Sequence, residues 1–197
     1  LFRPAVGFAA VALLERAGCM VDIPHSQTCC GQPAYNSGDR RTSAELASQV
    51  IAAFAGYDYV VAPSGSCAGM LRKHYPALFE EGTPGRATAE DFAAKCHELI
   101  SFLTHVMQLK EAAGYCDRSV TYHDSCSGLR ELGIREEPRH LLQQIPGLEL
   151  KEMLEAVGRS LRDLRVDCGL TIAEVARAVG IDRSYLSRIE RGERAAS

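Results

Sequence analysis

The sequence predicts an α/β domain with a mostly parallel sheet flanked by helices, followed by a small all-α module. Strand-like apolar runs alternate with segments of helical periodicity up to about residue 153, which is the pattern of βαβ units. After that point only helical periodicity continues. Hydrophobic residues make up 46% and charged residues 24% of the 197 residues, which is typical of a globular protein and excludes a disordered or collagen-like chain.

The expected elements follow one another in a regular order. Apolar and β-branched runs predict strands at 19–23, 57–62, 119–123 and 148–151. Apolar residues on one face predict helices between them at 6–17, 42–54, 68–79, 89–107 and 138–144. Three further helices joined by tight turns are predicted at 154–167, 171–179 and 183–190. We therefore expect one domain over 1–153 and a second over 154–197.

Charge and hydropathy limit the classes of protein. The formal net charge is −3, which argues against a polycation that coats nucleic acid along its whole length. The longest apolar run covers ten residues, 5–14, and is too short to span a bilayer. Glu15 and Arg16 stand where a lipoprotein signal needs apolar or small residues. We therefore expect a cytoplasmic protein without a membrane span.

Eight cysteines are many for this length, and they could form disulfides or serve metal or redox chemistry. Cys29 and Cys30 are adjacent, and a disulfide between neighbours strains the peptide geometry. This pair follows one predicted strand, Cys67 follows the next, and Cys126 follows a third. Loops after the carboxyl ends of parallel strands gather at one sheet edge. Thiolates that converge there suit an iron–sulfur cluster or zinc; the alternative is that these thiols are buried and inert.

The remaining cysteines and histidines give weaker evidence of a functional site. Four other cysteines are interpreted as small apolar side chains: Cys19, Cys96, Cys116 and Cys168. His123 is interpreted as a hydrogen-bonding group beside the ligands, and the helical histidines, His74 among them, as surface or otherwise satisfied residues. The sequence holds neither a Gly-x-Gly-x-x-Gly fingerprint nor a Ser–His–Asp signature, so no catalytic residue is predicted.

Three motifs carry a family resemblance. They are Cys-Cys-Gly-Gln-Pro-Ala-Tyr-Asn-Ser-Gly at 29–38, Tyr-Val-Val-Ala-Pro-Ser-Gly-Ser-Cys at 59–67 and Tyr-His-Asp-Ser-Cys at 122–126. Over about residues 1–153 the chain resembles the cysteine-rich "CCG" domain proteins of the lactate utilisation protein A and glycolate oxidase iron–sulfur subunit type. The resemblance implies an iron–sulfur cluster, electron transfer from the oxidation of an organic hydroxy acid, and other subunits of a lactate-oxidising complex as partners.

The family pattern has two repeats, each with an early Cys, a Cys-Cys-Gly and a later Cys. By resemblance, Cys29, Cys30 and Cys67 correspond to ligands of the first repeat and Cys126 to the early Cys of the second. The early Cys of the first repeat and the second Cys-Cys-Gly have no counterpart in this sequence. We therefore expect a truncated cysteine domain in which cluster loading is incomplete, and a cluster that oxygen destroys readily.

The last 44 residues hold helix signals of a different kind, with eight arginines against seven acidic residues. Thr171 and Glu174 form a capping box at the start of the second helix. Gly180 can end that helix with a positive φ, and Asp182 can cap the third helix. The apolar residues predict a shared core of Leu161, Leu164, Leu170, Ile172, Val175, Val179, Ile181, Leu186 and Ile189. Two helices joined by a tight glycine turn predict a helix-turn-helix.

This segment resembles the Cro/C1-type (XRE) helix-turn-helix family over 159–192, through Gly-Leu-Thr-Ile-Ala-Glu-Val-Ala at 169–176 and Ser-Tyr-Leu-Ser-Arg-Ile-Glu-Arg-Gly at 184–192. The resemblance implies DNA as a further partner. It places Arg183, Ser184, Ser187 and Arg188 toward bases and Thr171 toward phosphate. The family usually has one or two more helices, so we expect this module to be truncated as well; the alternative is a helical cap whose arginines are merely solvated.

Three functions remain open at this point. The first is an iron–sulfur electron-transfer subunit of an L-lactate or related 2-hydroxy acid oxidising complex, with an appended helix-turn-helix. The second is a DNA-binding regulator whose cysteine domain senses redox state or a metal. The third is a defective fusion of two incomplete domains. Iron content separates the first from the third, and DNA binding separates out the second.

Overall fold

The structure is a computed structural model that describes residues 4–109 and 114–193. These residues form two compact units. Unit 1 comprises 4–109 and 124–140, and unit 2 comprises 114–123 and 141–193.

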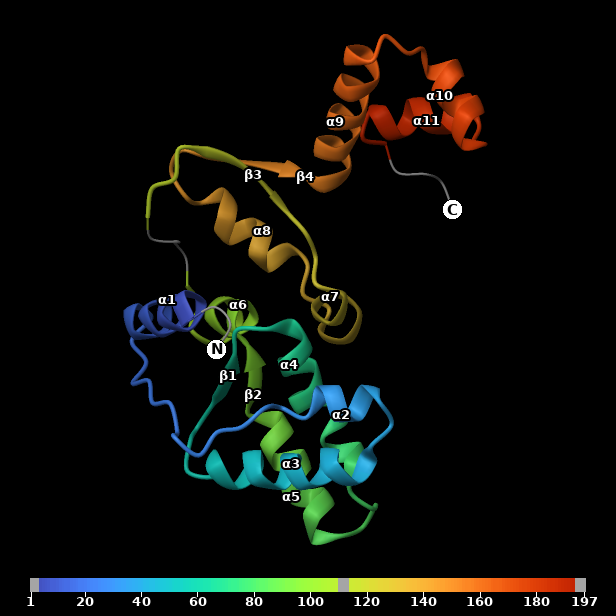
Figure 1. The fold of residues 1–197 in the computed structure, drawn as a ribbon. Helices are drawn as coiled ribbons and strands as arrows, with labels where there is room; N and C mark the ends of the chain where they lie inside the picture. The colour runs from blue at the N-terminus through green and yellow to red at the C-terminus, as the bar shows by residue number, and fades with distance from the viewer. Residues whose placement is uncertain (1–3, 110–113, 194–197) are drawn as a thin grey trace. The chain divides into compact units, whose positions relative to one another are not determined.

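Unit 1 is built from short helices around one pair of parallel strands (Figure 1). Its α-helices are α1 (Pro4–Arg16), α2 (Gln32–Asn36), α3 (Arg40–Ala53), α4 (Gly65–Gly69), α5 (Pro84–Ala94), α6 (Leu99–Ser101), α7 (Cys126–Leu132) and the first part of α8 (Glu136–Gln143). Its other helices are the π-helices η1 (Met70–His74) and η3 (Phe102–Val106) and the 3₁₀-helix η2 (Pro76–Leu78). Strand β1 (Val60–Ala62) pairs in parallel with β2 (Cys96–Glu98), so that Val60 lies opposite Cys96.

The core of unit 1 lies around this strand pair. The largest fully buried side chains include Tyr75, Phe102 and Met70. One cluster joins Val60 of β1 and Phe92 of α5 with Met70 and Tyr75, and Cys30 and Cys67 pack against its side. A second cluster combines α1 with the segment that follows β2. Burial of the apolar faces of these helices is the main force that holds the unit together.

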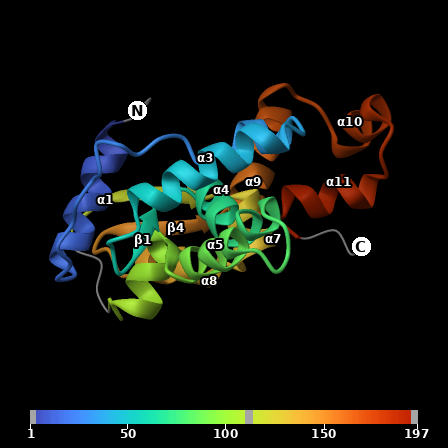
Figure 2. The ribbon, with the colours of Figure 1, turned by 90° about the horizontal axis from the view of Figure 1, so that it is seen from below.

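Unit 2 combines a second parallel strand pair with three helices. Strand β3 (Arg118–Tyr122) pairs with β4 (Leu148–Glu152), and α9 (Met153–Asp167) begins directly after β4. Helices α10 (Ile172–Val179) and α11 (Arg183–Glu190) follow. Helix α11 contacts both α9 and α10 (Figure 2). Helices α9 and α11 approach closely at Gly158 of α9, where a Cβ would clash with the backbone carbonyl of Ile189.

The predicted fold class is confirmed: parallel strands flanked by helices are followed by a helical helix-turn-helix module. The domain boundary near residue 153 stays a prediction. Among the described residues, no helix combines the length and hydrophobicity that crossing a membrane requires.

Two predicted elements were wrong. Residues 19–23 form no strand: Cys19 and Val21 pack against the cluster of α1 and the segment after β2, whereas Met20 and Ile23 are exposed. The helix predicted at 89–107 is interrupted by β2, which buries Cys96 beside Val60 of β1. Helical periodicity is a local signal, and pairing with a distant strand overrides it here. The parallel strands also form two separate pairs, β1–β2 and β3–β4.

Candidate cysteine site and helix-turn-helix surface

Cys30 and Cys67 lie together in unit 1, with their Sγ atoms 3.5 Å apart. Cys30 precedes α2, and Cys67 is in α4, the helix that follows strand β1. Both thiols are half-buried against the core. The polypeptide turns sharply after Cys30 because Gly31 has φ 80°, a conformation that a side chain would strain.

Neighbouring groups hold the two thiols in different protonation states. The hydrogen bond from Cys30, helped by the hydroxyls of Ser64 and Ser66, lowers the pKa of Cys67 to about 6. The same hydrogen bond, together with burial, raises the pKa of Cys30. These opposite shifts favour the thiolate form at Cys67 rather than at Cys30, and a thiolate is the form that binds a metal.

Backbone contacts fix the position of Cys30. The buried Tyr75 donates a hydrogen bond from its hydroxyl to the Cys30 carbonyl over 3.0 Å. Burial raises the pKa of Tyr75, and the nearby thiols raise it further, so the phenol stays protonated and keeps donating. No motif in the sequence signals this contact, because the two residues are 45 positions apart.

Cys29 and Cys126 are exposed and stand outside this pair. Cys126 begins α7, and Ser125 caps that helix by accepting a hydrogen bond from the Gly128 N–H over 3.1 Å. A Cβ on Gly65 of α4 would lie 2.8 Å from the Ser125 hydroxyl, so the two helices are in close contact. Two residues along a helix turn the direction of a side chain by about 200°. Cys67 therefore projects from the face of α4 opposite to the one that α7 covers.

The loop before Cys126 is held by an ion pair. Arg139 of α8 donates from Nη1 and Nη2 to the two carboxylate oxygens of Asp124, over 2.8 Å each. Arg139 is also bonded to the carbonyl of Arg135. Such a bidentate pair restricts orientation as well as distance, so the Asp-Ser-Cys segment is held against α8.

The Cys30–Cys67 pair has a spacing that fits a shared metal ion, whereas the four predicted cysteine ligands are not gathered into one site. Two thiolates bound at about 2.3 Å to one tetrahedral ion stand about 3.8 Å apart, close to the 3.5 Å between Cys30 and Cys67. In the described part of the chain, no group of three or more Cys, His, Asp or Glu side chains is arranged to hold a metal ion. The ligand roles of Cys29, Cys30, Cys67 and Cys126 stay predictions.

Other candidate residues take structural positions. Burial raises the pKa of Cys96 to about 12, so its thiol is inert, and the Cys19 thiol contacts the Met107 sulfur over 3.7 Å. His123, expected beside the ligands, lies in unit 2 with Nδ1 3.3 Å from the Met153 sulfur. His74 bonds Glu131 over 3.0 Å.

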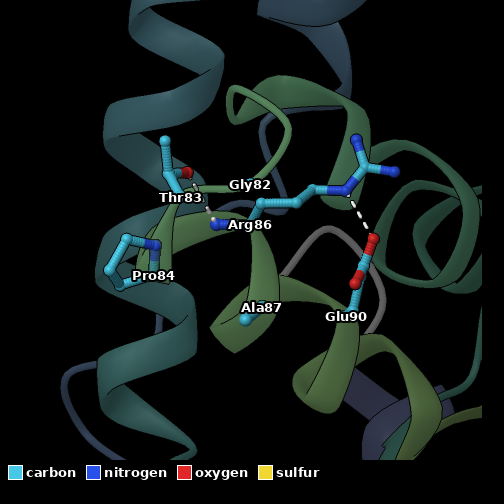
Figure 3. Close-up of a pocket in the computed structure, with 6 residues that line it drawn as sticks. All are labelled: Gly82, Thr83, Pro84, Arg86, Ala87 and Glu90. Atoms are coloured by element: carbon cyan, nitrogen blue, oxygen red, sulfur yellow. Dashed lines mark hydrogen bonds and ion pairs between the residues drawn. The ribbon is translucent and has the colours of Figure 1, made fainter.

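A hollow of about 380 Å³ lies at the start of α5, and no cysteine lines it (Figure 3). Its charged groups are already paired, since Arg86 Nε donates to Glu90 Oε1 over 2.6 Å. Thr83 accepts from the Arg86 N–H and caps the helix. The hollow therefore presents a satisfied helix start, and it does not belong to the candidate site.

The helix-turn-helix forms as the capping signals predict. Thr171 and Glu174 form the complete capping box, and Gly180 ends α10 with φ 69°. Asp182 caps α11 by accepting from the N–H groups of Ser184 and Tyr185. These caps satisfy backbone donors that the helix itself leaves open.

The core of this module is smaller than predicted. Leu186 is buried and Ile172, Val175, Ile181 and Ile189 are half-buried. Four residues of the predicted core are exposed: Leu161, Leu164, Leu170 and Val179. Helical periodicity marks an apolar face, but it does not say whether another segment covers that face.

A buried ion pair is the part of the module that the sequence analysis misses. Arg165 of α9 donates from Nε and Nη2 to the two oxygens of Glu190 in α11, over 2.6 and 2.8 Å. The Glu190 side chain is only 5% exposed. The hydrogen bond from Arg165 lowers the pKa of Glu190, so the carboxylate stays charged and links two helices. Arginine and glutamate 25 positions apart carry no pattern that would reveal this.

The residues expected to face DNA differ in availability. Arg183 is exposed, and the half-buried Arg188 guanidinium lies 6.0 Å from the centre of the Tyr185 ring. Three hydroxyls already have partners: that of Thr171 donates to Glu174, that of Ser184 donates to Asp182, and that of Ser187 accepts from Arg191. Contact with DNA through these hydroxyls would require sharing or exchanging those partners.

Comparison with known proteins supports both the cysteine-rich region and the helix-turn-helix segment. The family model of the cysteine-rich domain matches residues 2–72 and 120–160, more than half of the chain. A helix-turn-helix domain model matches residues 156–197. No solved structure matches the chain significantly.

Several bacterial proteins named lactate utilization protein A are similar to this chain. The protein of Geobacillus kaustophilus is 49% identical over 150 residues, which cover 76% of this chain and 62% of that protein. That of Halalkalibacterium halodurans is 43% identical over 153 residues, or 78% and 62% of the two chains. The chain thus spans somewhat less than two thirds of the length of these relatives. The matched motifs and the family model together show that this chain belongs to the family of cysteine-rich domain proteins.

Proposed function

We propose that this chain is an iron–sulfur protein that carries electrons within a multi-subunit complex oxidising L-lactate or a related 2-hydroxy acid. Its proposed cluster ligands are Cys29, Cys30, Cys67 and Cys126. The observation that supports this most is the Cys30–Cys67 sulfur pair, 3.5 Å apart, in a family defined by its cysteines. The link to lactate rests on the names of relatives up to 49% identical.

In this proposal, the chain supplies soft ligands and a protected place for them. When bound, an iron–sulfur cluster accepts and donates single electrons. The Cys67 thiolate offers a ready ligand, and the hydroxyls of Ser64 and Ser66 stabilise its charge. Cys29 and Cys126, which are exposed, are the two further proposed ligands. A cytoplasmic location belongs to the same proposal, because eight free thiols persist best in a reducing compartment.

The test is anaerobic reconstitution of the full chain with ferrous iron and sulfide. We expect iron and acid-labile sulfide to remain bound after desalting, and the bound species to undergo a reversible one-electron reduction followed by electron paramagnetic resonance. Exposure to air should bleach the visible absorbance. A chain that retains zinc but no iron and sulfide would contradict the proposal.

The link to lactate requires a separate test. A Bacillus licheniformis strain that lacks its own lactate utilization protein A should grow on L-lactate when this chain is supplied. A Cys67→Ser version, expressed to the same level, is the matched control and should fail to support growth. Equal growth with both versions, or with neither, would argue against the proposed role in lactate oxidation.

A second candidate function is a DNA-binding regulator whose cysteine domain senses redox state or a metal. The specific observation in its favour is the well-capped α10–α11 pair in a segment that matches a helix-turn-helix domain. We expect a single module to bind DNA weakly, because this motif usually reads two half-sites as a dimer. Selection of bound sequences from a random DNA pool, followed by Arg183→Ala and Arg188→Ala, tests it. Each change should cost about 1–3 kcal/mol on the preferred sequence.

A further inference from the structure

Two consecutive residues, His74 and Tyr75, contact the segments that carry the candidate cysteines. His74 is the last residue of the π-helix η1, and Tyr75 follows it. Helix η1 continues α4, the helix that contains Cys67. The Tyr75 N–H bonds the Met70 carbonyl five residues earlier, over 3.0 Å. This wider π-turn changes the direction of the side chains that follow it, and such turns are frequent at functional sites.

The contacts of His74 and Tyr75 run in two directions. The Tyr75 hydroxyl donates to the Cys30 carbonyl over 3.0 Å. The His74 ring lies 4.7 Å from the ring of Tyr35 in α2, the helix that begins after Cys30. On its other side, His74 Nε2 bonds Glu131 Oε2 of α7 over 3.0 Å. One short segment thus connects the Cys30 side of the site to the helix that Cys126 begins.

Glycines let α7 approach closely enough for this bond. A Cβ on Gly69 of α4 would lie 2.5 Å from Glu131 Oε2, and one on Gly65 would lie 3.0 Å from the Gly128 backbone. The face of α4 that these glycines form is the one opposite to Cys67. Docking of α7 on that face therefore sets the rotation of α4 about its axis, and with it the position of the Cys67 sulfur relative to Cys30.

We propose that His74 and Glu131 are positioning residues for the thiol pair: their bond locks α7 onto the glycine face of α4 and so keeps the Cys67 sulfur beside that of Cys30. The inference deepens the proposed function, on which its importance for iron binding rests. Partners of this kind around a metal site typically change metal affinity by about 10–100-fold when removed.

The test uses a probe that reports the thiol pair without any cluster. Phenylarsine oxide bridges two nearby thiols: two As–S bonds form, the arsenical oxygen leaves with the two thiol protons as water, and no electrons are transferred. The full chain should carry Cys29→Ser, so that the adjacent Cys29–Cys30 pair cannot bind the probe. In that background, Glu131→Ala should weaken phenylarsine oxide binding by roughly 10-fold.

Two further variants at the contact between α4 and α7 test the same bond. Glu131→Gln can still hydrogen-bond His74 Nε2 and should recover most of the lost affinity. Gly69→Ala leaves every charge in place but pushes the Glu131 carboxylate away, and it should weaken binding in the same direction. It also keeps the test decisive if Glu131→Ala does not fold.

Unit 1 offers a matched control. His105 Nε2 is hydrogen-bonded to Glu137 Oε1 over 2.8 Å, a similar pair that joins η3 to α8. Glu137→Ala should leave probe affinity unchanged. Unchanged affinity in Glu131→Ala, or an equal loss in Glu137→Ala, would overturn the positioning role.

Iron reconstitution of the chain with Cys29 intact separates this inference from the proposed function. If Glu131→Ala weakens the probe but the parent chain binds no iron, the positioning role stands and the iron–sulfur function fails. If the parent chain assembles a cluster and Glu131→Ala binds probe and iron equally well, the function stands and the positioning role fails.

Discussion

The cysteine site and the helix-turn-helix module differ in how far apart in sequence their contacting residues lie. The Cys30 thiol donates a hydrogen bond to the Cys67 sulfur 37 positions away, and His74 is hydrogen-bonded to Glu131 57 positions away. In the module, Thr171 and Glu174 are three positions apart, and Asp182 caps its helix through residues two and three positions on. The site therefore depends on the packing of unit 1 as a whole, whereas the helix ends of the module are specified locally. The Arg165–Glu190 pair, across 25 positions, is where the module itself depends on tertiary structure.

The largest expected effect is on metal binding at the site. Cys67→Ser replaces a thiolate by a hydroxyl, which is a poor ligand for iron. We expect iron retained after anaerobic reconstitution to fall by roughly 10-fold or more. Cys168→Ser, which changes an exposed thiol of unit 2, should leave iron unchanged. Equal loss of iron in both variants would mean that the Cys30–Cys67 pair is no more important for iron binding than an exposed cysteine elsewhere in the chain.

The next effect concerns the ion pair that links two helices of the module. Glu190→Gln leaves the Arg165 guanidinium, 13% exposed, without its charged partner. Removing one member of a buried pair is strongly destabilising, and we expect the free energy of unfolding of unit 2 to fall by about 2 kcal/mol. Urea unfolding followed by circular dichroism measures it. Glu193→Gln breaks an exposed pair with Arg191 and should change stability little. A similar loss in both would remove the distinction between buried and surface pairs.

A smaller effect is expected at the local cap. Thr171→Ala removes the hydroxyl that accepts from the Glu174 N–H over 3.2 Å. Loss of such a cap lowers the free energy of unfolding by about 1 kcal/mol. Urea unfolding measures this change as well. Thr171→Ser keeps the hydroxyl and should recover most of it. If Thr171→Ala lowered the free energy of unfolding more than Glu190→Gln does, the local cap would contribute more to the stability of the module than the ion pair between its helices, and the contrast between the two regions would fail.

The smallest effect is a graded dependence on pH. Arg165 lowers the pKa of Glu190 below its ordinary value of 4.5 in the folded module. The ion pair therefore stabilises the module fully above about pH 4.5, and this contribution is lost as the pH falls through the lower folded-state pKa. Unfolding of the parent chain should be more acid-sensitive below pH 4.5 than that of Glu190→Gln. Identical slopes would contradict the assigned pKa shift.

Much of the fold was predictable wherever a few neighbouring residues decide it. The capping box of Thr171, the turn at Gly180 and the cap at Asp182 all form as predicted, because each depends on hydrogen bonds within a turn of helix. Strands at 60–62, 118–122 and 148–152 lie within or close to the predicted ranges. The strand expected at 19–23 does not form, and its Cys19 and Val21 pack against a cluster of helical residues instead.

The family and the fold class follow from the sequence alone, because motifs and local periodicity carry them, whereas the structure pairs only two of the four cysteines that the sequence singles out. Only the tertiary structure decided that Cys30 and Cys67 are the thiols in contact, that His74 and Glu131 bond across α4 and α7, and that Leu164 and Val179 stay exposed. The physical reason is distance along the chain. A cap or a turn gains its hydrogen bonds from adjacent residues, whereas a thiol pair or a buried charge exists only after separate segments have packed against one another.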